Sequence, residues 1–162
     1  VVVDVAYALW ASGDAMALEQ VLLNLLTNAA HAISGSGRDG RIVVRARREG
    51  NRVVIVVEDN GTGMDEETAR RAFEPFFTTK PFGMGTGLGL SVSLGLVRAM
   101  GGDLRVERTS EAGTVMRLEL PATDERPATR GPTPVPRGSM RRRILVVDDD
   151  RAVRASMRRD FP

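Results

Sequence analysis

Apolar residues recur every three to four positions from residue 14 to residue 33, which predicts an amphipathic helix. The positions expected to face the core are Leu18, Leu22, Leu25, Ala29 and Ala32. Asp14 can cap the start of this helix, and the glycine-rich residues 35–40 end it. The same spacing aligns a polar stripe on the opposite side, formed by Gln20, Asn24, Asn28 and His31. Taken by itself, this stripe indicates only a solvated helix face.

Runs of β-forming residues predict strands at residues 1–5, 42–47 and 53–57. Gly50-Asn51 suits a tight turn between the second and the third of these strands. Two later strands are expected from alternating apolar positions, which are Leu104 and Val106 in one and Met116, Leu118 and Leu120 in the other. Gly113 is expected in the turn between them.

Two more helices are expected, and the stretch between them has neither period. Asp65 can cap a short helix that continues to Phe73, and Pro75 prevents its extension. A longer helix occupies residues 88–100 and is closed by Gly101-Gly102. Residues 74–86 follow neither the helical nor the strand period, although they hold three of the five phenylalanines. This pattern is typical of a lid whose aromatic side chains pack in one closed state.

Glycines surround the two loops in which chemistry is expected. Asp59 follows the third strand and precedes Gly61 and Gly63, so a flat ligand could approach its carboxylate closely. A carboxylate accepts a hydrogen bond from the exocyclic amine of adenine, whereas guanine presents an acceptor at that position. Before the helix at residues 88–100, a second group of glycines alternates with other residues, at Gly83, Gly85, Gly87 and Gly89. The free N–H groups at the start of that helix can hold phosphate.

Four segments resemble, in order, the boxes of the histidine kinase branch of the GHKL ATP-binding superfamily: LEQVLLNLLTNAAHAI, DNGTGM, FEPFFTTK and GMGTGLGLS. The resemblance covers roughly residues 10–121. Neither the P-loop pattern nor the dinucleotide G-x-G-x-x-G pattern occurs in the chain. The resemblance implies an α/β two-layer sandwich at residues 1–121, in which helices cover one face of a mixed sheet and ATP lies between helices and lid.

The resemblance also implies a role for individual residues. Asn28 would ligate a magnesium ion that bridges the phosphates of ATP, and Asp59 would select adenine. Lys80 would act catalytically by reaching the γ-phosphate when the lid closes. The phosphates would also contact a loop formed by Gly85, Thr86, Gly87, Leu88 and Gly89. Thr114 matches a strand threonine that supports the adenine-binding aspartate.

Asn24 matches the position at which hydrolytic members of the superfamily carry a glutamate base. An amide cannot deprotonate water, so Asn24 in this catalytic and nucleotide-binding position favours phosphoryl transfer over hydrolysis. His31, the only histidine, falls where many relatives carry a lysine near the phosphates. It is not expected to be the phosphorylated histidine, because the family's acceptor lies on a separate helical hairpin and is followed by an acidic residue.

Composition narrows the class of protein further. The 162 residues contain no cysteine, which excludes a disulfide framework. No apolar run reaches about 18 residues, so a cytoplasmic chain is the expectation, although the full-length protein could be membrane-anchored. A formal charge of +2 does not indicate a nucleic-acid partner. Lys80 is the only lysine, and it falls where the family uses a basic residue, which favours a functional role over a solvated side chain.

The composition changes after Leu120. Residues 122–140 are rich in proline and arginine and are expected to form an extended linker. Residues 141–162 include ILVVDDD and resemble the opening of a response-regulator receiver domain, in which Asp148 and Asp149 would help to bind magnesium. This stretch is too short to fold as a receiver, so we expect it to be poorly ordered or loosely helical.

The resemblance predicts the ATP-binding catalytic domain of a hybrid sensor histidine kinase. It implies transfer of the γ-phosphoryl group of ATP to a histidine on a dimerisation domain that this chain lacks, with magnesium as cofactor. The receiver domain or a response regulator would be the next partner, and a homodimer is expected only for the full-length protein. The alternatives are a GHKL-type ATPase and a non-catalytic nucleotide-binding interaction module.

Overall fold

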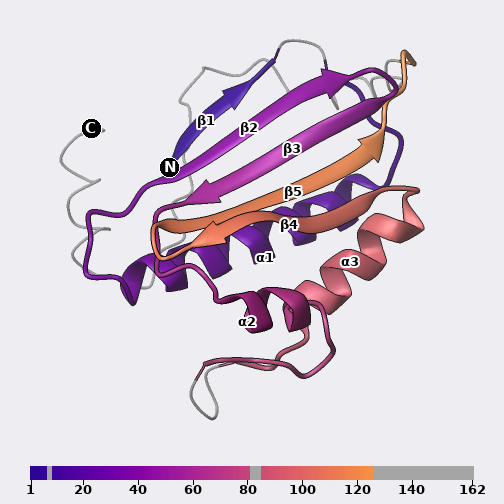
Figure 1. Ribbon diagram of the computed structural model, residues 1–162. Coiled ribbons are helices and arrows are strands. Elements are labelled where there is room, and N and C mark those ends of the chain that lie inside the picture. The colour runs from indigo at the N-terminus through magenta and orange to yellow at the C-terminus, as the bar shows by residue number, and fades with distance from the viewer. Residues whose placement is uncertain (7–8, 81–84, 126–162) are drawn as a thin grey trace, which may run out of the picture. The chain divides into compact units, whose positions relative to one another are not determined.

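The computed structural model describes residues 1–6, 9–80 and 85–125 (Figure 1). The greater part of the predicted linker and the whole predicted receiver start, with Asp148 and Asp149, lie outside the described residues. No helix in the described ranges is long and apolar enough to cross a membrane.

Five strands form one mixed sheet with the order β1-β2-β3-β5-β4. Its strands are β1 (Val2–Val5), β2 (Ile42–Glu49), β3 (Arg52–Asp59), β4 (Asp103–Ser110) and β5 (Gly113–Pro121). Only β1 and β2 pair in parallel; the other neighbours are antiparallel. The helices are α1 (Ala15–Ser34), α2 (Glu66–Arg71) and α3 (Gly89–Ala99). Figure 1 shows α1 and α3 on the same face of the sheet, so the predicted α/β two-layer sandwich is confirmed.

The first helix begins where its cap was predicted, because the Asp14 carboxylate accepts a hydrogen bond from the N–H of Ala17 at 2.9 Å. Of the five positions predicted to face the core, Leu25 and Ala29 are buried, whereas Leu18, Leu22 and Ala32 are only half-buried. Val21, which was not predicted, is completely buried. Burial of a side chain such as Val21 contributes roughly 1.5–3 kcal/mol, so this missed position is one of the main anchors of α1 on the sheet.

The strands are slightly longer than the apolar patterns indicated. Asp59 is the last residue of β3, at the strand end where it was predicted, and Gly113 opens β5 instead of occupying the turn. The hydrogen bonds of the domain also continue past residue 121. The N–H of Ala122 donates to the carbonyl of Asn51 at 2.8 Å, and the N–H of Thr123 donates to the carbonyl of Trp10 at 3.0 Å. The boundary of the linker remains a prediction.

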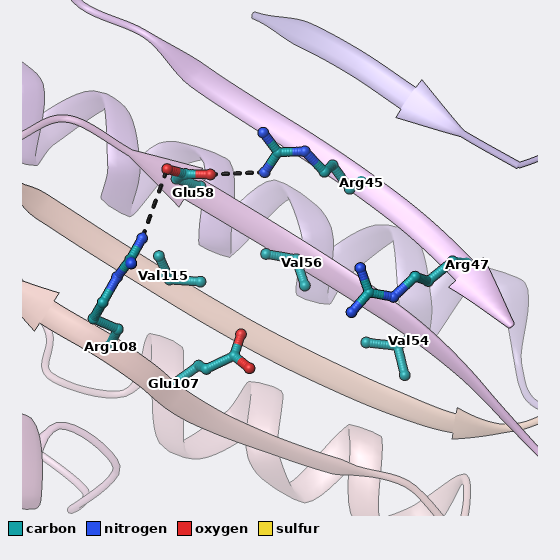
Figure 2. A pocket seen from close by; sticks show the side chains of 8 residues that line it. All are labelled: Arg45, Arg47, Val54, Val56, Glu58, Glu107, Arg108 and Val115. Atoms are coloured by element: carbon teal, nitrogen blue, oxygen red, sulfur yellow. Dashed lines mark hydrogen bonds and ion pairs between the residues drawn. The ribbon is translucent and has the colours of Figure 1, made fainter. Parts of the chain in front are cut away.

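The face of the sheet opposite α1 and α3 is covered by charged side chains (Figure 2). Glu58 accepts a hydrogen bond from Arg45 at 2.7 Å and lies 3.9 Å from Arg108. These long side chains stand beside valines such as Val54, which is 1% exposed. Arginine stems can cover apolar surface while their guanidinium groups stay in water. The arginine stems therefore shield part of the apolar surface of this face from water.

Candidate functional site

Asp59 is a buried carboxylate at the end of β3, with 8% of its surface exposed. Its Oδ1 accepts hydrogen bonds from the N–H of Gly61 at 2.9 Å and from the N–H of Thr114 at 3.3 Å. Burial raises the pKa of the Asp59 carboxyl, and these two donors oppose the rise. Within the described part of the chain no group donates to Oδ2, so this oxygen can accept a hydrogen bond from a ligand amine.

The glycines of the loop after Asp59 are needed for contacts within the protein. A Cβ at Gly61 would lie 2.5 Å from the carbonyl carbon of Ala32, near the end of α1. Gly63 has φ +68°, and a Cβ there would lie 1.7 Å from the carbonyl oxygen of Ser110. The sequence suggested ligand approach as the reason for these glycines, whereas their Cβ directions face helix and strand backbone. Their proposed role in nucleotide binding stays a prediction.

Lys80 meets two residues of the polar stripe on α1. Its Nζ donates to Asn28 Oδ1 at 3.3 Å and lies 3.0 Å from Nδ1 of His31. An ammonium group can only donate, so this contact is a hydrogen bond in the tautomer of His31 in which Nδ1 is the acceptor. Residues more than forty positions apart in the chain are thus gathered at one point above α1.

Asn24 lies one turn earlier on α1 and faces α3. Its Nδ2 donates to the hydroxyl of Ser93 at 3.0 Å, and Ser93 is 2% exposed. A Cβ at Gly89 would lie 2.4 Å from Asn24 Oδ1, so the first turn of α3 packs directly on this amide. Ser93 was not among the predicted site residues. Ser93 lies three positions after Leu90 and four before Val97, on the apolar face of the helical run, and a serine at such a position was the signal that could have indicated a buried polar contact.

The glycine-rich loop before α3 packs on the segment that contains Phe76. The N–H of Phe76 donates to the carbonyl of Gly87 at 2.9 Å, and a Cβ at Gly87 would lie 2.3 Å from the carbonyl carbon of Phe76. A Cβ at Gly85 would lie 2.8 Å from Thr78 Oγ1. Thr86 accepts a hydrogen bond from the N–H of Leu88 at 3.3 Å. Leu88 precedes α3 without a side-chain cap, which leaves the N–H groups of the first turn available to an anion.

The predicted site residues therefore fall into two groups. The first group surrounds the end of β3 and contains Asp59, Gly61, Gly63 and Thr114. The second group lies at α1 and the loop before α3 and contains Asn24, Asn28, His31, Lys80, Gly85, Thr86, Gly87, Leu88 and Gly89. The N–H of Thr62 donates to the carbonyl of Ala32 at 3.1 Å and so ties the loop of the first group to the helix of the second. The hollow shown in Figure 2 lies on the outer face of the sheet and contains none of these residues.

Residues 13–124 match a family model described as "Histidine kinase-, DNA gyrase B-, and HSP90-like ATPase". The chain belongs to this family. The match includes both groups of site residues and ends before Asp148 and Asp149.

Sensor proteins are among the similar curated sequences. "C4-dicarboxylate transport sensor protein DctB" from Pseudomonas aeruginosa is 41% identical over 112 residues, which are 69% of this chain and 18% of that protein. "Two-component sensor PprA" from the same organism is 48% identical over 118 residues, covering 70% of this chain and 13% of that protein. The chain thus spans less than a fifth of the length of these two relatives.

Solved structures of this family have the same fold. The "Mycobacterial sensor histidine kinase MprB" superposes with a TM-score of 0.61 at 31% identity, covering 75% of this chain and 81% of that one. A nucleotide-free catalytic domain of the histidine kinase ThkA has a TM-score of 0.60 at 33% identity, covering 74% and 78%. The chain is accordingly an ATP-binding domain of the histidine kinase type.

Proposed function

We propose that this chain is the catalytic ATP-binding domain of a hybrid sensor histidine kinase, which transfers the γ-phosphoryl group of ATP to a histidine of a separate dimerisation domain. The observation that carries the proposal is the convergence of Lys80 with Asn28 and His31, at 3.3 and 3.0 Å. An ammonium, an amide oxygen and an imidazole make a group suited to a phosphate and its metal ion.

Each residue would contribute binding or charge. Asp59 Oδ2 would accept from the adenine amine, and the N–H groups at the start of α3 would donate to phosphate oxygens. Asn28 Oδ1, a neutral oxygen, would ligate magnesium after Lys80 moves from it to a phosphate oxygen. When bound, Mg²⁺-ATP supplies the phosphoryl group, and the metal neutralises part of the phosphate charge. His31 would touch a phosphate oxygen from the side.

Transfer is favoured over hydrolysis by the chemistry of Asn24. An amide is not a base, and Nδ2 of Asn24 is already engaged by Ser93 at 3.0 Å. A water near this amide would therefore not lose its proton to it. This argues against the GHKL-type ATPase as the function of the domain.

The parts of the proposal beyond the ATP-binding domain rest on sequence. Residues 122–140 would form the linker, and residues 141–162 would begin a receiver domain whose Asp148 and Asp149 help to bind magnesium. The phosphorylated dimerisation domain would pass its phosphoryl group to that receiver or to a response regulator. The full-length protein would form a homodimer, and its ATP-binding domain would lie in the cytoplasm, where ATP is available.

The test is to mix the chain with separately produced histidine-bearing dimerisation domains and radiolabelled ATP. We expect acid-labile label on the added domain and none on the chain itself, for both the unchanged protein and His31→Ala. Label on the isolated chain that disappears in His31→Ala would contradict the assignment. Rapid phosphate release without an acceptor would support an ATPase, and nucleotide binding with no transfer to any acceptor would support an interaction module.

A further inference from the structure

We propose that Thr109 is a positioning residue that sets the direction of the Thr114 hydroxyl, and thereby favours a purine with an amine at C6 over one with a carbonyl. The inference rests on the proposed nucleotide-binding function of Asp59. It adds a specificity determinant from β4, a strand whose residues the family boxes do not include.

A β-bulge in β4 places Thr109 in the site. Val106 pairs with Met116, but the next pair is Arg108 with Val115, so the register shifts between these two positions. Without this shift Arg108 would stand opposite Thr114, because antiparallel strands otherwise pair residue by residue. The bulge makes Thr109 the partner of Thr114 instead.

The shift also decides where the arginine goes. Figure 2 shows Arg108 on the outer face of the sheet, where its Nη2 lies 3.9 Å from Glu58. An arginine opposite Thr114 would stand near Asp59, since Asp59 is the partner of Thr114 on the other side. Its guanidinium would compete with any ligand amine for the carboxylate. The bulge therefore produces a row of Asp59, Thr114 and Thr109 across three strands, with no cation in it.

Thr109 also holds the far end of the loop that follows Asp59. Its Oγ1 accepts a hydrogen bond from the N–H of Met64 at 2.8 Å and lies 3.3 Å from the Met64 carbonyl. The same oxygen lies 3.4 Å from Oγ1 of Thr114. Within the described ranges, no other side chain hydrogen-bonds to the backbone of Met64.

The count of protons gives the direction of the Thr114 hydroxyl. Thr109 has one hydroxyl proton. The Met64 carbonyl can only accept it, whereas the Thr114 hydroxyl can itself donate, so both hydrogen bonds form only when Thr109 donates to the carbonyl. With that proton committed, Thr109 can only accept from Thr114. The Thr114 hydroxyl then points its proton toward Thr109 and keeps both oxygen lone pairs for other donors. Beside the acceptor Asp59, a second acceptor favours an amine and disfavours a carbonyl.

Removal of the Thr109 hydroxyl frees the Thr114 proton. The Thr114 hydroxyl could then donate as readily as it accepts, so a carbonyl at C6 would be tolerated better. Adenine has an amine at C6 and an unprotonated N1, whereas the base of inosine triphosphate has a carbonyl at C6 and a proton on N1. Calorimetry with Mg²⁺ gives the affinities of each variant for ATP and for inosine triphosphate, and the change of their ratio between variants measures the effect of Thr109. We expect Thr109→Val to lower the ratio of the ATP to the inosine triphosphate affinity about three- to tenfold, the effect of one neutral hydrogen bond.

Two variants separate positioning from a general structural effect. Thr109→Ser keeps the hydroxyl and should keep the ratio, and Thr123→Val makes the same change near Trp10, away from Asp59, and should also keep it. Circular dichroism verifies folding, and Thr109→Ala removes the same hydroxyl if the valine variant does not fold. An unaltered ratio of the ATP to the inosine triphosphate affinity in the folded Thr109→Val or Thr109→Ala protein would overturn the role of Thr109, as would an equal fall of this ratio in Thr109→Ser. Either result would leave the proposed function intact. No ATP binding by the unchanged chain would contradict the proposed function as well.

Discussion

Asp59 is buried, and in the described part of the chain only one of its two carboxylate oxygens accepts hydrogen bonds. Its pKa is raised because burial penalises the charged form more than the N–H groups of Gly61 and Thr114 stabilise it. A carboxyl whose folded-state pKa is raised costs stability once the pH exceeds its unfolded-state pKa, because the folded protein holds the proton more tightly. At neutral pH this carboxylate therefore destabilises the fold, while its free oxygen serves a ligand.

Asp59→Asn should accordingly separate stability from binding. The amide keeps an oxygen for the N–H of Gly61 and of Thr114 but carries no charge, so we expect a higher unfolding temperature at pH 7. ATP affinity should fall about tenfold to a hundredfold, because the amide turns a donor toward the adenine amine. Calorimetric titration and thermal unfolding on the same preparations measure both quantities. Equal ATP affinities of the two proteins would remove Asp59 from the site.

The third helix contains two glycines with opposite surroundings. Gly95 is exposed, and no atom lies within 4 Å of its Cβ direction, whereas a Cβ at Gly89 would lie 2.4 Å from Asn24 Oδ1. Gly95→Ala should stabilise the protein by roughly 0.5–1 kcal/mol, because alanine loses less backbone entropy in a helix, and it should leave ATP binding unchanged. Gly89→Ala should displace Asn24 and weaken both stability and binding. Denaturant unfolding and calorimetric titration with ATP measure the stability and the ATP affinity of both variants. Equal stability and equal affinity of Gly95→Ala and Gly89→Ala would contradict this prediction.

The lid predicted at residues 74–86 should respond to the γ-phosphate of ATP. The Nζ of Lys80 contacts Asn28 and His31. If this ammonium group moved to a γ-phosphate, it would hold the described residues of the predicted lid, 74–80 and 85–86, against the bound nucleotide. We expect amide hydrogen exchange of these residues to slow with a non-hydrolysable ATP analogue and much less with ADP. In Lys80→Ala the two nucleotides should protect equally, whereas Arg70→Ala on α2 should behave as the unchanged protein. Equal protection by both nucleotides in the unchanged protein would contradict the role of Lys80.

On the outer face of the sheet, Arg117 forms ion pairs with residues of several strands. Arg117 on β5 bonds to Glu49 of β2 at 2.6 Å and to Glu119 at 2.7 Å, and it lies 3.6 Å from Glu107 of β4. Hydrogen bonds from Arg117 lower the pKa of both Glu49 and Glu119 below the ordinary 4.5. Carboxylates with a lowered folded-state pKa contribute stability above their ordinary pKa and lose it as the pH falls through the lowered value.

Acid unfolding should therefore depend on Arg117. The unfolding temperature of the unchanged protein should fall as the pH drops below about 4.5, because Glu49 and Glu119 become protonated and leave Arg117. Arg117→Gln should unfold at a lower temperature at pH 7 and show a flatter dependence on pH. Arg70→Gln removes an exposed pair on α2 and should leave the curve nearly unchanged. Parallel curves for the unchanged protein and Arg117→Gln would contradict this account.

Much of the fold and most site candidates were readable from residue order, because local physics determines them. Caps such as Asp14 and Asp65 bond three residues onward, and the helical and strand periods depend on immediate neighbours. The four boxes likewise have a fixed order, so their family could be inferred before any contact was known. The placement of Asp59 at a strand end followed from the same local pattern.

Other features depended on contacts between distant segments. The apolar spacing of α1 did not single out Val21 as fully buried, because that depends on how the helix lies on the sheet. Asn24 and Ser93 are 69 positions apart, and their hydrogen bond exists only because α1 and α3 lie side by side.

The β4 bulge is the clearest feature that the sequence could not predict. Residue order determined that a threonine follows Arg108, but only the shifted register with β5 decided that Thr109 faces Thr114 while the arginine faces outward. The sequence by itself determined the elements, the family and the chemical groups, because these depend on residues close together along the chain. The tertiary structure decided which groups meet, because strand register and helix packing minimise the free energy of the whole fold.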